Sequence, residues 1–309
     1  MIEFEQATRR YGDIAAVDGV SLRIERGEFF VIVGSSGAGK STLLRMINGL
    51  IPCSAGTIRI DGRDIRTLNA EDLRRRLGYV IQSIGLFPHW TVARNIAAVP
   101  DLLGWPAEKI RARTLALLLL LKLDHEVYLN KYPHQLSIGQ QQRVGIARAL
   151  AADPEGLLMD EPFAALDPIT REALQREIAS IHRGSGKTII FVTHDMNEAL
   201  MLASRIAVMD QGRVVQVGTA AELLTKPSND FVRSLVGRDD AGLMLLSTEK
   251  VADRMRHGAG EGETSITAEA SLRQALSRML LVRAERLAVV DNAGRTIGTI
   301  DIGDLVRRR

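Results

Sequence analysis

The feature that most constrains the fold is a glycine-rich loop between an apolar run and a helical pattern. Residues 29–33 read Phe-Phe-Val-Ile-Val, a continuous apolar run typical of a strand that is buried on both faces. Directly after it, Gly34–Ser41 fits the pattern G-x-x-x-x-G-K-[ST], and a helical pattern runs from Lys40 to about Leu50. Strand, loop and helix in this order predict a phosphate-binding loop at the end of a strand.

The residue types of this loop suit nucleotide phosphates. Glycines let backbone N–H groups turn toward phosphate oxygens, and the N-terminus of the following helix adds a favourable potential for anions. Lys40 is expected to reach the β- and γ-phosphates, and Ser41 to offer its hydroxyl to Mg²⁺. The alternative is a glycine-rich turn without a ligand, which the Lys-Ser pair in register disfavours. The expected nucleotide contacts of this segment are Gly34, Ser35, Ser36, Gly37, Ala38, Gly39, Lys40, Ser41 and Thr42.

A second apolar run ends in two carboxylates. Residues 157–159 read Leu-Leu-Met and lead directly into Asp160 and Glu161. Asp160 is placed to organise Mg²⁺, directly or through water, and Glu161 to polarise an attacking water as a general base. Acids at the end of a strand are weak evidence alone. Together with the phosphate loop, they indicate nucleotide hydrolysis.

The order of the elements predicts an α/β fold. Apolar strand patterns at 29–33, 156–159 and 188–192 alternate with helical segments, which favours a mostly parallel sheet covered on both faces. After Phe231 the composition shifts, and 258–263 resembles a flexible loop within a small C-terminal βαββα unit. The expected organisation is a nucleotide-binding domain at 1–236 with a helical subdomain at about 86–154, a linker at 237–248 and a small α/β unit at 249–309.

Composition limits the class of protein. The single cysteine, Cys53, excludes an intrachain disulfide and fits a reducing compartment. The N-terminus has no signal-peptide pattern, and the longest apolar stretch, 115–121, is far shorter than the ~20 residues that cross a bilayer. We therefore expect a soluble protein that reaches a membrane only through a partner. The net charge of +3 is spread over scattered arginines without interleaved aromatic residues, so no nucleic-acid partner is expected.

Five further segments resemble the motifs of ABC ATPases, in the order in which that family has them. Residues 136–143, Leu-Ser-Ile-Gly-Gln-Gln-Gln-Arg, resemble the family's signature motif. Tyr11 stands where the family stacks an aromatic ring on adenine, and Gln82 where it has the Q-loop glutamine. Residues 165–167 resemble the D-loop, and His194 the switch histidine. The resemblance covers roughly residues 1–236.

The resemblance implies a P-loop NTPase with a RecA-like core and a helical subdomain, working as a head-to-tail homodimer with ATP and Mg²⁺. It assigns catalysis to Glu161, His194 and Gln82, and the metal to Ser41, Gln82 and Asp160. His194 would contact the γ-phosphate in its own subunit. Each ATP would also meet the other subunit, through Ser137, Gly139, Gln140 and Asp167.

One residue departs from the family pattern, which usually has glycine where this chain has Ile138. A β-branched residue does not easily adopt positive φ, and it brings bulk close to the expected interface. Gly139, which lies nearer the phosphate in the usual pattern, is retained. The substitution therefore predicts weaker or slower closure of the dimer rather than loss of activity.

Two segments resemble one kind of transporter. Residues 87–90, Phe-Pro-His-Trp, lie where ABC importers meet the coupling helix of the permease, although ordinary packing explains them equally well. With residues 163–171, they resemble the importers of quaternary amines such as glycine betaine, choline and proline betaine. Importers of this type imply permease subunits in the membrane, an extracytoplasmic solute-binding protein, and a motor bound to the cytoplasmic face of the inner membrane.

The C-terminal unit resembles a single CBS motif, which quaternary-amine importers commonly carry. The resemblance rests on residues 286–295, 297–300 and 304–305, with an amphipathic helix expected over 271–280. CBS motifs work in pairs, so the two subunits are expected to pair their single copies. Asp301 stands where adenosine-binding members have Thr or Ser, so no regulatory nucleotide is expected.

Two other functions remain open from sequence. One is an ABC importer of another small polar solute, which the CBS-like tail disfavours only by association. The other is a soluble ABC ATPase of DNA repair or translation. Such proteins carry long coiled coils or a second ATPase half, and the sequence shows neither. A stand-alone kinase is excluded by the signature and D-loop segments.

Overall fold

The computed structural model describes residues 1–237, 241–258, 264–291 and 293–306. Its contacts divide the chain into two units, Met1–Val217 and Gly218–Arg309. The division falls earlier than the expected boundary after residue 236, because helix α9 (Ala220–Thr225) packs against helix α11 (Ala241–Thr248) in the second unit. Helix α11 also occupies most of the segment that we expected to be a linker.

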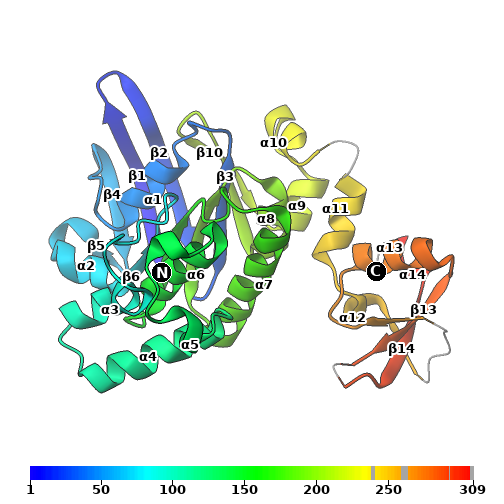
Figure 1. Ribbon diagram of the computed structural model, residues 1–309. Coiled ribbons are helices and arrows are strands. Elements are labelled where there is room, and N and C mark those ends of the chain that lie inside the picture. The colour runs from blue at the N-terminus through cyan, green and yellow to red at the C-terminus, as the bar shows by residue number, and fades with distance from the viewer. Residues whose placement is uncertain (238–240, 259–263, 292, 307–309) are drawn as a thin grey trace. The chain divides into compact units, whose positions relative to one another are not determined.

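A six-stranded sheet forms the centre of the first unit (Figure 1), and the α/β fold expected from the sequence is confirmed. Strand β3 (Phe29–Gly34) is buried at every residue and pairs in parallel with both of its neighbours. The strand order is β10 (Arg213–Gly218), β9 (Arg205–Asp210), β3, β8 (Thr188–Thr193), β7 (Gly156–Asp160) and β6 (Leu77–Val80). Because β6, β7 and β8 also pair in parallel, their carboxyl ends meet at one edge of the sheet.

A second sheet of four antiparallel strands packs near the first. Its order is β2 (Ile14–Ile24), β1 (Ile2–Tyr11), β4 (Ala55–Ile60) and β5 (Arg63–Asp64). Helix α1 (Lys40–Ile47) shares one hydrophobic core with both sheets, in which Phe4, Ile32 and Leu43 are almost fully buried. This core holds the start of α1 at the end of β3.

Helices α7 (Pro168–Ser185) and α8 (Met196–Leu202) lie against the central sheet. The ring of Phe29 in β3 meets that of His182 in α7 edge-on, at 5.3 Å between centroids. Phe163 packs against Phe191 of β8 at 5.2 Å. Both faces of the central strands are therefore covered, which explains why their sequences are apolar without alternation.

A helical region follows β6, as the sequence predicts. It contains α3 (Val92–Leu102), α4 (Ala107–Leu120), α5 (His125–Tyr128), a 3₁₀ turn at Pro133–Gln135 and α6 (Ile138–Leu150). Earlier in the chain, a 3₁₀ turn at Ile65–Thr67 and α2 (Ala70–Arg76) connect β5 to β6. The leucine run at 115–121 has one buried face, with Leu118 fully buried and Leu119 76% exposed. Among the described residues, no helix is both long and apolar enough to span a bilayer.

The second unit has its own sheet and core. The strand order is β11 (Arg256–His257), β14 (Thr296–Asp301), β13 (Arg286–Val290) and β12 (Ser265–Thr267), with α12 (Val251–Arg254), α13 (Leu272–Val282) and α14 (Ile302–Val306). Val251, Leu272 and Ile300 are fully buried in its core, and Leu246 of α11 packs against it. The predicted βαββα order is present in β12, α13, β13, β14 and α14. Residues 259–263 of the expected flexible loop lie outside the described residues.

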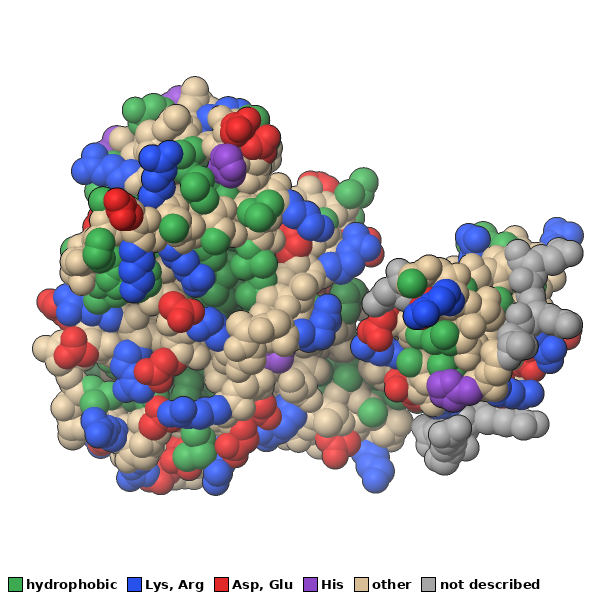
Figure 2. Space-filling model, turned by 90° about the horizontal axis from the view of Figure 1, so that it is seen from below, with side chains coloured by type: hydrophobic (Ala, Val, Ile, Leu, Met, Phe, Trp, Pro, Cys, Tyr) green, Lys and Arg blue, Asp and Glu red, His purple; other side chains and the backbone are tan. Residues whose placement is uncertain are grey.

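The surface carries charges of both signs. On the face in Figure 2, Lys and Arg side chains of the described residues lie among those of Asp and Glu. Ion pairs join several charged side chains of the described residues, as Arg76 joins Glu155 at 2.8 Å and Arg205 joins Glu28 at 3.0 Å. The small net charge of +3 is therefore distributed over mixed surface rather than gathered on this face.

Candidate active site

The loop between β3 and α1 has a backbone that demands glycine. A Cβ atom at Gly34 would lie 2.1 Å from the carbonyl oxygen of Met209, and one at Gly39 2.1 Å from that of Ala16. Gly39 also has a φ of +94°, and it is the N-cap of α1 without a side-chain hydrogen bond to the helix. The first backbone N–H groups of α1 are therefore not capped by a side chain at Gly39, which leaves this helix start suited to an anion.

Lys40 lies folded against the loop that precedes it. Its side chain is nearly buried, and its Nζ donates hydrogen bonds to the carbonyl oxygens of Gly34 and Ser35, each at 2.8 Å. Burial lowers the pKa of Lys40, and the carboxylates of Glu161 and Asp160 partly oppose this by raising it. The ammonium group is thus held at the rim of the loop, beside the N-terminus of α1.

Asp160 is fully buried at the end of β7 and binds the hydroxyl of Ser41. Ser41 Oγ donates to Asp160 Oδ1 at 2.6 Å, a length typical of a strong hydrogen bond to a carboxylate. Asp160 Oδ2 accepts from Arg45 Nη2 and from the Tyr79 hydroxyl, both at 3.4 Å. Because the Ser41 proton is directed at Asp160, the lone pairs of the hydroxyl oxygen stay available to a cation.

Three polar residues meet where neighbouring strands end. Gln82 follows β6, Glu161 follows β7 and His194 follows β8. Glu161 Oε2 accepts a hydrogen bond from Gln82 Nε2 at 3.2 Å and lies 3.2 Å from His194 Nδ1. Glu161 has a φ of +44°, uncommon for a residue with a side chain, and its N–H donates to the Val192 carbonyl at 3.0 Å. The parallel register of the sheet therefore brings three distant segments to one carboxylate.

One pocket joins these three residues to the phosphate loop. It is lined by Ala16, by residues 36–42, and by Gln82, Glu161 and His194. Gly34 and Ser35 bind Lys40 through their carbonyl groups, and Asp160 lies behind Ser41. The residues predicted from the phosphate loop, the strand-end acids, the Q-loop and the switch are thus gathered at one place.

Besides Gly34, Ser35 and Asp160, which lie next to it, five predicted residues do not line this pocket. Tyr11 is 48% exposed, and its ring carries the guanidinium of Arg9 at 4.5 Å from the ring centroid. Ser137 and Gln140 form a capping box at the start of α6, in which each side chain accepts a hydrogen bond from the other's backbone N–H. Asp167 caps α7 by accepting from the N–H groups of Ile169 and Thr170. The remaining residue, Gly139, is buried in the first turn of α6.

Ile138 does not have the strained backbone that the sequence predicted, and that prediction is wrong. Ile138 begins α6 and is absent from the described residues with positive φ, because the helix gives it an ordinary negative φ. Its side chain is 52% exposed, so the argument from bulk is unaffected. The glycine requirement lies at Gly139 instead, where a Cβ atom would lie 2.5 Å from Thr170 Cγ2 of α7.

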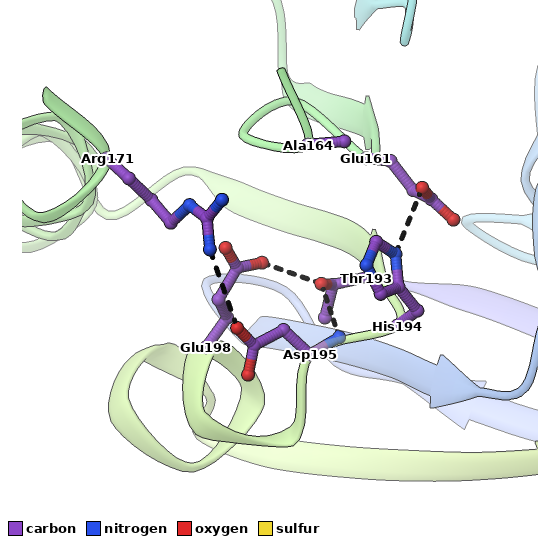
Figure 3. Close-up of a pocket in the computed structure, with 7 residues that line it drawn as sticks. All are labelled: Glu161, Ala164, Arg171, Thr193, His194, Asp195 and Glu198. Carbon is purple, nitrogen blue, oxygen red and sulfur yellow. Dashed lines mark hydrogen bonds and ion pairs between the residues drawn. The ribbon is translucent and has the colours of Figure 1, made fainter. Parts of the chain in front are cut away.

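A second group of polar residues lies beside His194 and was not predicted from the sequence. Arg171, Thr193, Asp195 and Glu198 line a small pocket together with Glu161 and His194 (Figure 3). Glu198 is only 5% exposed, and burial raises the pKa of its carboxyl group. The available signal was its spacing of four from Leu202, which places both residues on one face of a helix.

Comparison with known proteins identifies the family. A family model described as ABC transporter matches residues 17–164, and one described as CBS domain matches residues 261–309. The chain is 50% identical over 306 residues to the glycine betaine uptake system ATP-binding protein YehX of Escherichia coli strain K12, covering 99% of each chain. It is 46% identical to the glycine betaine/carnitine/choline transport ATP-binding protein OpuCA of Bacillus subtilis strain 168, covering 98% of this chain and 78% of that one.

Solved structures agree with the sequence relatives. A dimeric structure of the ATP-binding cassette MJ0796, in a post-hydrolysis state with ADP and phosphate, is 34% identical with a TM-score of 0.65. The match covers 71% of this chain and 99% of that one. With a relative half identical over nearly its whole length, the chain belongs to the ABC transporter family, as an ATP-binding protein that couples ATP hydrolysis to transport.

Proposed function

We propose that this ATP-binding protein drives the uptake of a quaternary amine such as glycine betaine or choline. One observation carries the substrate class: relatives named for glycine betaine and choline match the chain over almost all of its length, including the C-terminal unit. An importer of another small polar solute is the competing assignment, and the uptake experiment below separates the two.

Mg²⁺ fits the residues at the end of β7, and we propose that Ser41, Asp160 and Gln82 hold it together with ATP. The described residues contain no cluster of three or more acidic, His or Cys side chains suited to a metal. Mg²⁺ bound to a nucleotide needs none, because phosphate oxygens and water supply most of its ligands. When bound, it neutralises charge on the β- and γ-phosphates. Asp160 orients the Ser41 hydroxyl for this role through the 2.6 Å hydrogen bond.

The phosphates of ATP are proposed to lie on residues 34–42. The N–H groups at the start of α1 face the pocket, and Lys40 would exchange its two carbonyl partners for phosphate oxygens. Both carbonyl groups belong to the same loop, so the ammonium group moves only a short way. Adenine is proposed to stack on Tyr11, whose exposed ring already binds one flat cation.

Hydrolysis is proposed to use Glu161 as the general base. Its Oε2 atom is approached by Gln82 and His194 from opposite neighbouring strands, so the carboxylate is fixed in direction. A water beside the γ-phosphate would give its proton to this carboxylate as its oxygen bonds to phosphorus, while the bond from phosphorus to the oxygen of the leaving ADP breaks. His194 would orient the γ-phosphate, and Gln82 would report its presence to the helical region that follows.

The second half of each site is proposed to come from a partner copy. Ser137, Gly139, Gln140 and Asp167 do not line their own chain's pocket, although all four lie at helix starts, where an anion is favoured. The MJ0796 structure, which is 34% identical, is dimeric. We propose a homodimer in which each signature segment meets the nucleotide of the other subunit.

The remaining partners follow from the importer assignment. We propose that the dimer binds integral membrane permease subunits at the cytoplasmic face of the inner membrane, and that an extracytoplasmic solute-binding protein delivers the amine to them. The permease contact is proposed at Phe87 and Trp90, whose rings pack in a tilted arrangement with centroids 4.3 Å apart, and Phe87 is 40% exposed. Asn95 fixes this loop by bonding both the N–H and the carbonyl of Phe87. No nucleic-acid partner is proposed.

The test is uptake of labelled glycine betaine and labelled choline in cells that lack the gene and its neighbouring importers. The cells receive wild-type protein, Glu161→Gln, or no protein. We expect uptake only with wild type, since Glu161→Gln keeps the shape of the site but removes the base, at a cost of about 10²- to 10⁴-fold in hydrolysis.

Equal uptake in all three strains would overturn the quaternary-amine assignment. Uptake restored equally by Glu161→Gln would overturn the role of Glu161. Labelled spermidine and a labelled amino acid serve as matched substrates. Wild-type-dependent uptake of one of these instead would favour the competing importer.

A further inference from the structure

The residue before His194 has a hydroxyl group that makes hydrogen bonds to two residues that follow the histidine. Thr193 is the last residue of β8 and is 2% exposed. Its Oγ1 donates to Glu198 Oε2 at 2.6 Å and accepts from the N–H of Asp195 at 3.0 Å. The hydrogen bond from the Asp195 N–H to Thr193 Oγ1 therefore closes the turn that carries His194.

Glu198 connects this turn to a different helix. It projects from α8 into the interior, and its second oxygen, Oε1, accepts from Gln175 Nε2 of α7 at 3.2 Å. Gln175 is itself 4% exposed. Helix α7 begins at the cap Asp167, in the segment that resembles the D-loop. A continuous path of buried hydrogen bonds thus runs from α7 through Glu198 to the residue that precedes His194.

The charges around Glu198 do not pair with it directly. Arg171 of α7 lies 3.8 Å from Asp195, and its Nη2 donates to the Leu166 carbonyl at 3.1 Å. Glu161 and His194 lie on the other side of the same small pocket (Figure 3). Burying a carboxyl group whose hydrogen bonds come only from neutral donors lowers the stability of the fold. An apolar side chain of similar volume would fill the same space with a smaller loss of stability. Packing alone therefore does not explain why a glutamate stands at position 198.

We propose that Glu198 is a positioning residue for ATP hydrolysis. Its two oxygens hold Thr193 and Gln175 at once, and this fixes the turn so that His194 Nδ1 stays 3.2 Å from Glu161. Glu198 does not touch the nucleotide, and it acts only through His194. The inference rests on the proposed hydrolysis at Glu161.

Truncation at Glu198 should affect turnover and not nucleotide binding. Glu198→Ala leaves the Thr193 hydroxyl and the Gln175 amide buried without their acceptor, and the turn is free to shift. Displacements of about 1 Å in a catalytic group cost up to about 10²-fold in rate, so we expect kcat to fall by about 10- to 100-fold. The phosphate loop is not in this network, so the KM for ATP should change by less than about twofold.

The experiment uses the full-length protein and measures kcat, KM and the melting temperature. The variants are Glu198→Ala, Glu198→Gln, His194→Ala and the double variant of Glu198→Ala with His194→Ala. Glu198→Gln keeps the shape and one carbonyl acceptor, so it should recover part of the lost kcat. The matched control is Ile178→Val, at a fully buried apolar position of α7, the helix that carries Gln175, and it should lower stability alone.

The double variant decides between positioning and general loosening. If Glu198 acts through His194, adding Glu198→Ala to His194→Ala should lower kcat by less than about twofold further. The imidazole NMR signal of His194, assigned by its loss in His194→Ala, should shift in Glu198→Gln and stay unchanged in Ile178→Val. This NMR measurement tests the proposal even if the residual rates are too small to compare or Glu198→Ala folds poorly.

Three results would overturn the inference. Additive losses in the double variant would do so, as would a His194 signal unmoved by Glu198→Gln or a wild-type kcat in Glu198→Ala. An active wild type with any of these results overturns the positioning role alone. A wild type that binds ATP without hydrolysing it overturns the proposed hydrolysis and, with it, this inference.

Discussion

Helices α1 and α6 both begin at residues expected to bind phosphate, and they begin in opposite ways. Helix α1 starts after Gly39 with no side chain capping its N–H groups, at a pocket that also holds Lys40. Helix α6 starts at Ser137 with a complete capping box formed with Gln140. One helix start leaves its backbone donors to a ligand, and the other satisfies them within the chain.

The surroundings of the two helix starts differ in the same sense. Around α1, three strand ends have already brought Gln82, Glu161 and His194 together. At α6, Ile138 is 52% exposed, and Ser137 does not line the pocket of the phosphate loop. The difference fits the proposed homodimer, in which one half-site is open to a ligand within the chain and the other is capped until the partner's nucleotide binds. The three variants below test this contrast.

The largest effect is expected at the open half-site. Lys40→Ala removes a nearly buried cation from the pocket, and a charged hydrogen bond is worth about 1.5–3 kcal/mol, so ATP affinity should fall by about 10- to 100-fold. Binding of a fluorescent ATP analogue to the full-length chain measures this. The control is Lys187→Ala, because Lys187 also donates to a backbone carbonyl, that of Pro154, but lies outside the pocket of the phosphate loop. Similar losses in both variants would contradict the contrast.

A smaller effect, of a different kind, is expected at the capped half. Ser137→Ala should leave ATP affinity unchanged while it lowers ATPase turnover by about tenfold, since one hydrogen bond to a charged phosphate is lost in the closed dimer. It should also cost about 1 kcal/mol of stability through the lost cap. Ser271→Ala is the matched control, because Ser271 forms the same box with Gln274 at the start of α13. An equal loss of turnover in Ser271→Ala would show that the cap, not the phosphate contact, matters.

The smallest effect is expected next to Ser137. Ile138→Gly removes exposed bulk, and a gain of about 0.5–1 kcal/mol in closure corresponds to a twofold to fivefold rise in turnover. Steady-state ATPase assays at several protein concentrations measure it. Ile302→Gly, at a half-exposed isoleucine that begins α14, is the control. Unchanged turnover in Ile138→Gly would show that this isoleucine does not hinder the dimer.

The open half-site was the part that the sequence predicted best. Gly34–Ser41, Asp160 and His194 each follow a strongly apolar strand, and parallel pairing forces such strand ends to one edge of the sheet. The position of the signature at a helix start was also visible from Ser137 and Gln140. The proposed contact of the signature segment with the partner's nucleotide depends on a second copy of the chain. No pattern within one chain determines how two copies are arranged.

Other features escaped prediction for physical reasons. The antiparallel sheet of β1, β2 and β4 has several register shifts, which blur the alternation that would identify it. Helix α11 occupies most of the segment that was predicted to be a linker, because its Leu246 packs against the hydrophobic core of the second unit. Glu198 belongs to none of the motifs found in the sequence, and only the packing of α8 against its neighbours buries it.

The strand order of the central sheet has a consequence for how the protein is made. Strand β3 is apolar throughout and ends at Gly34, but the strands on its two sides begin only at Thr188 and Arg205. While a ribosome synthesises the intervening segments, β3 therefore has two unpaired edges and nothing native to pair with. Among the described strands, β3, which leads into the phosphate loop, is followed by the longest stretch of chain before its first pairing partner is synthesised. Nascent chains halted before Thr188 should consequently depend on chaperones, and release from that dependence should coincide with the emergence of β8 and β9.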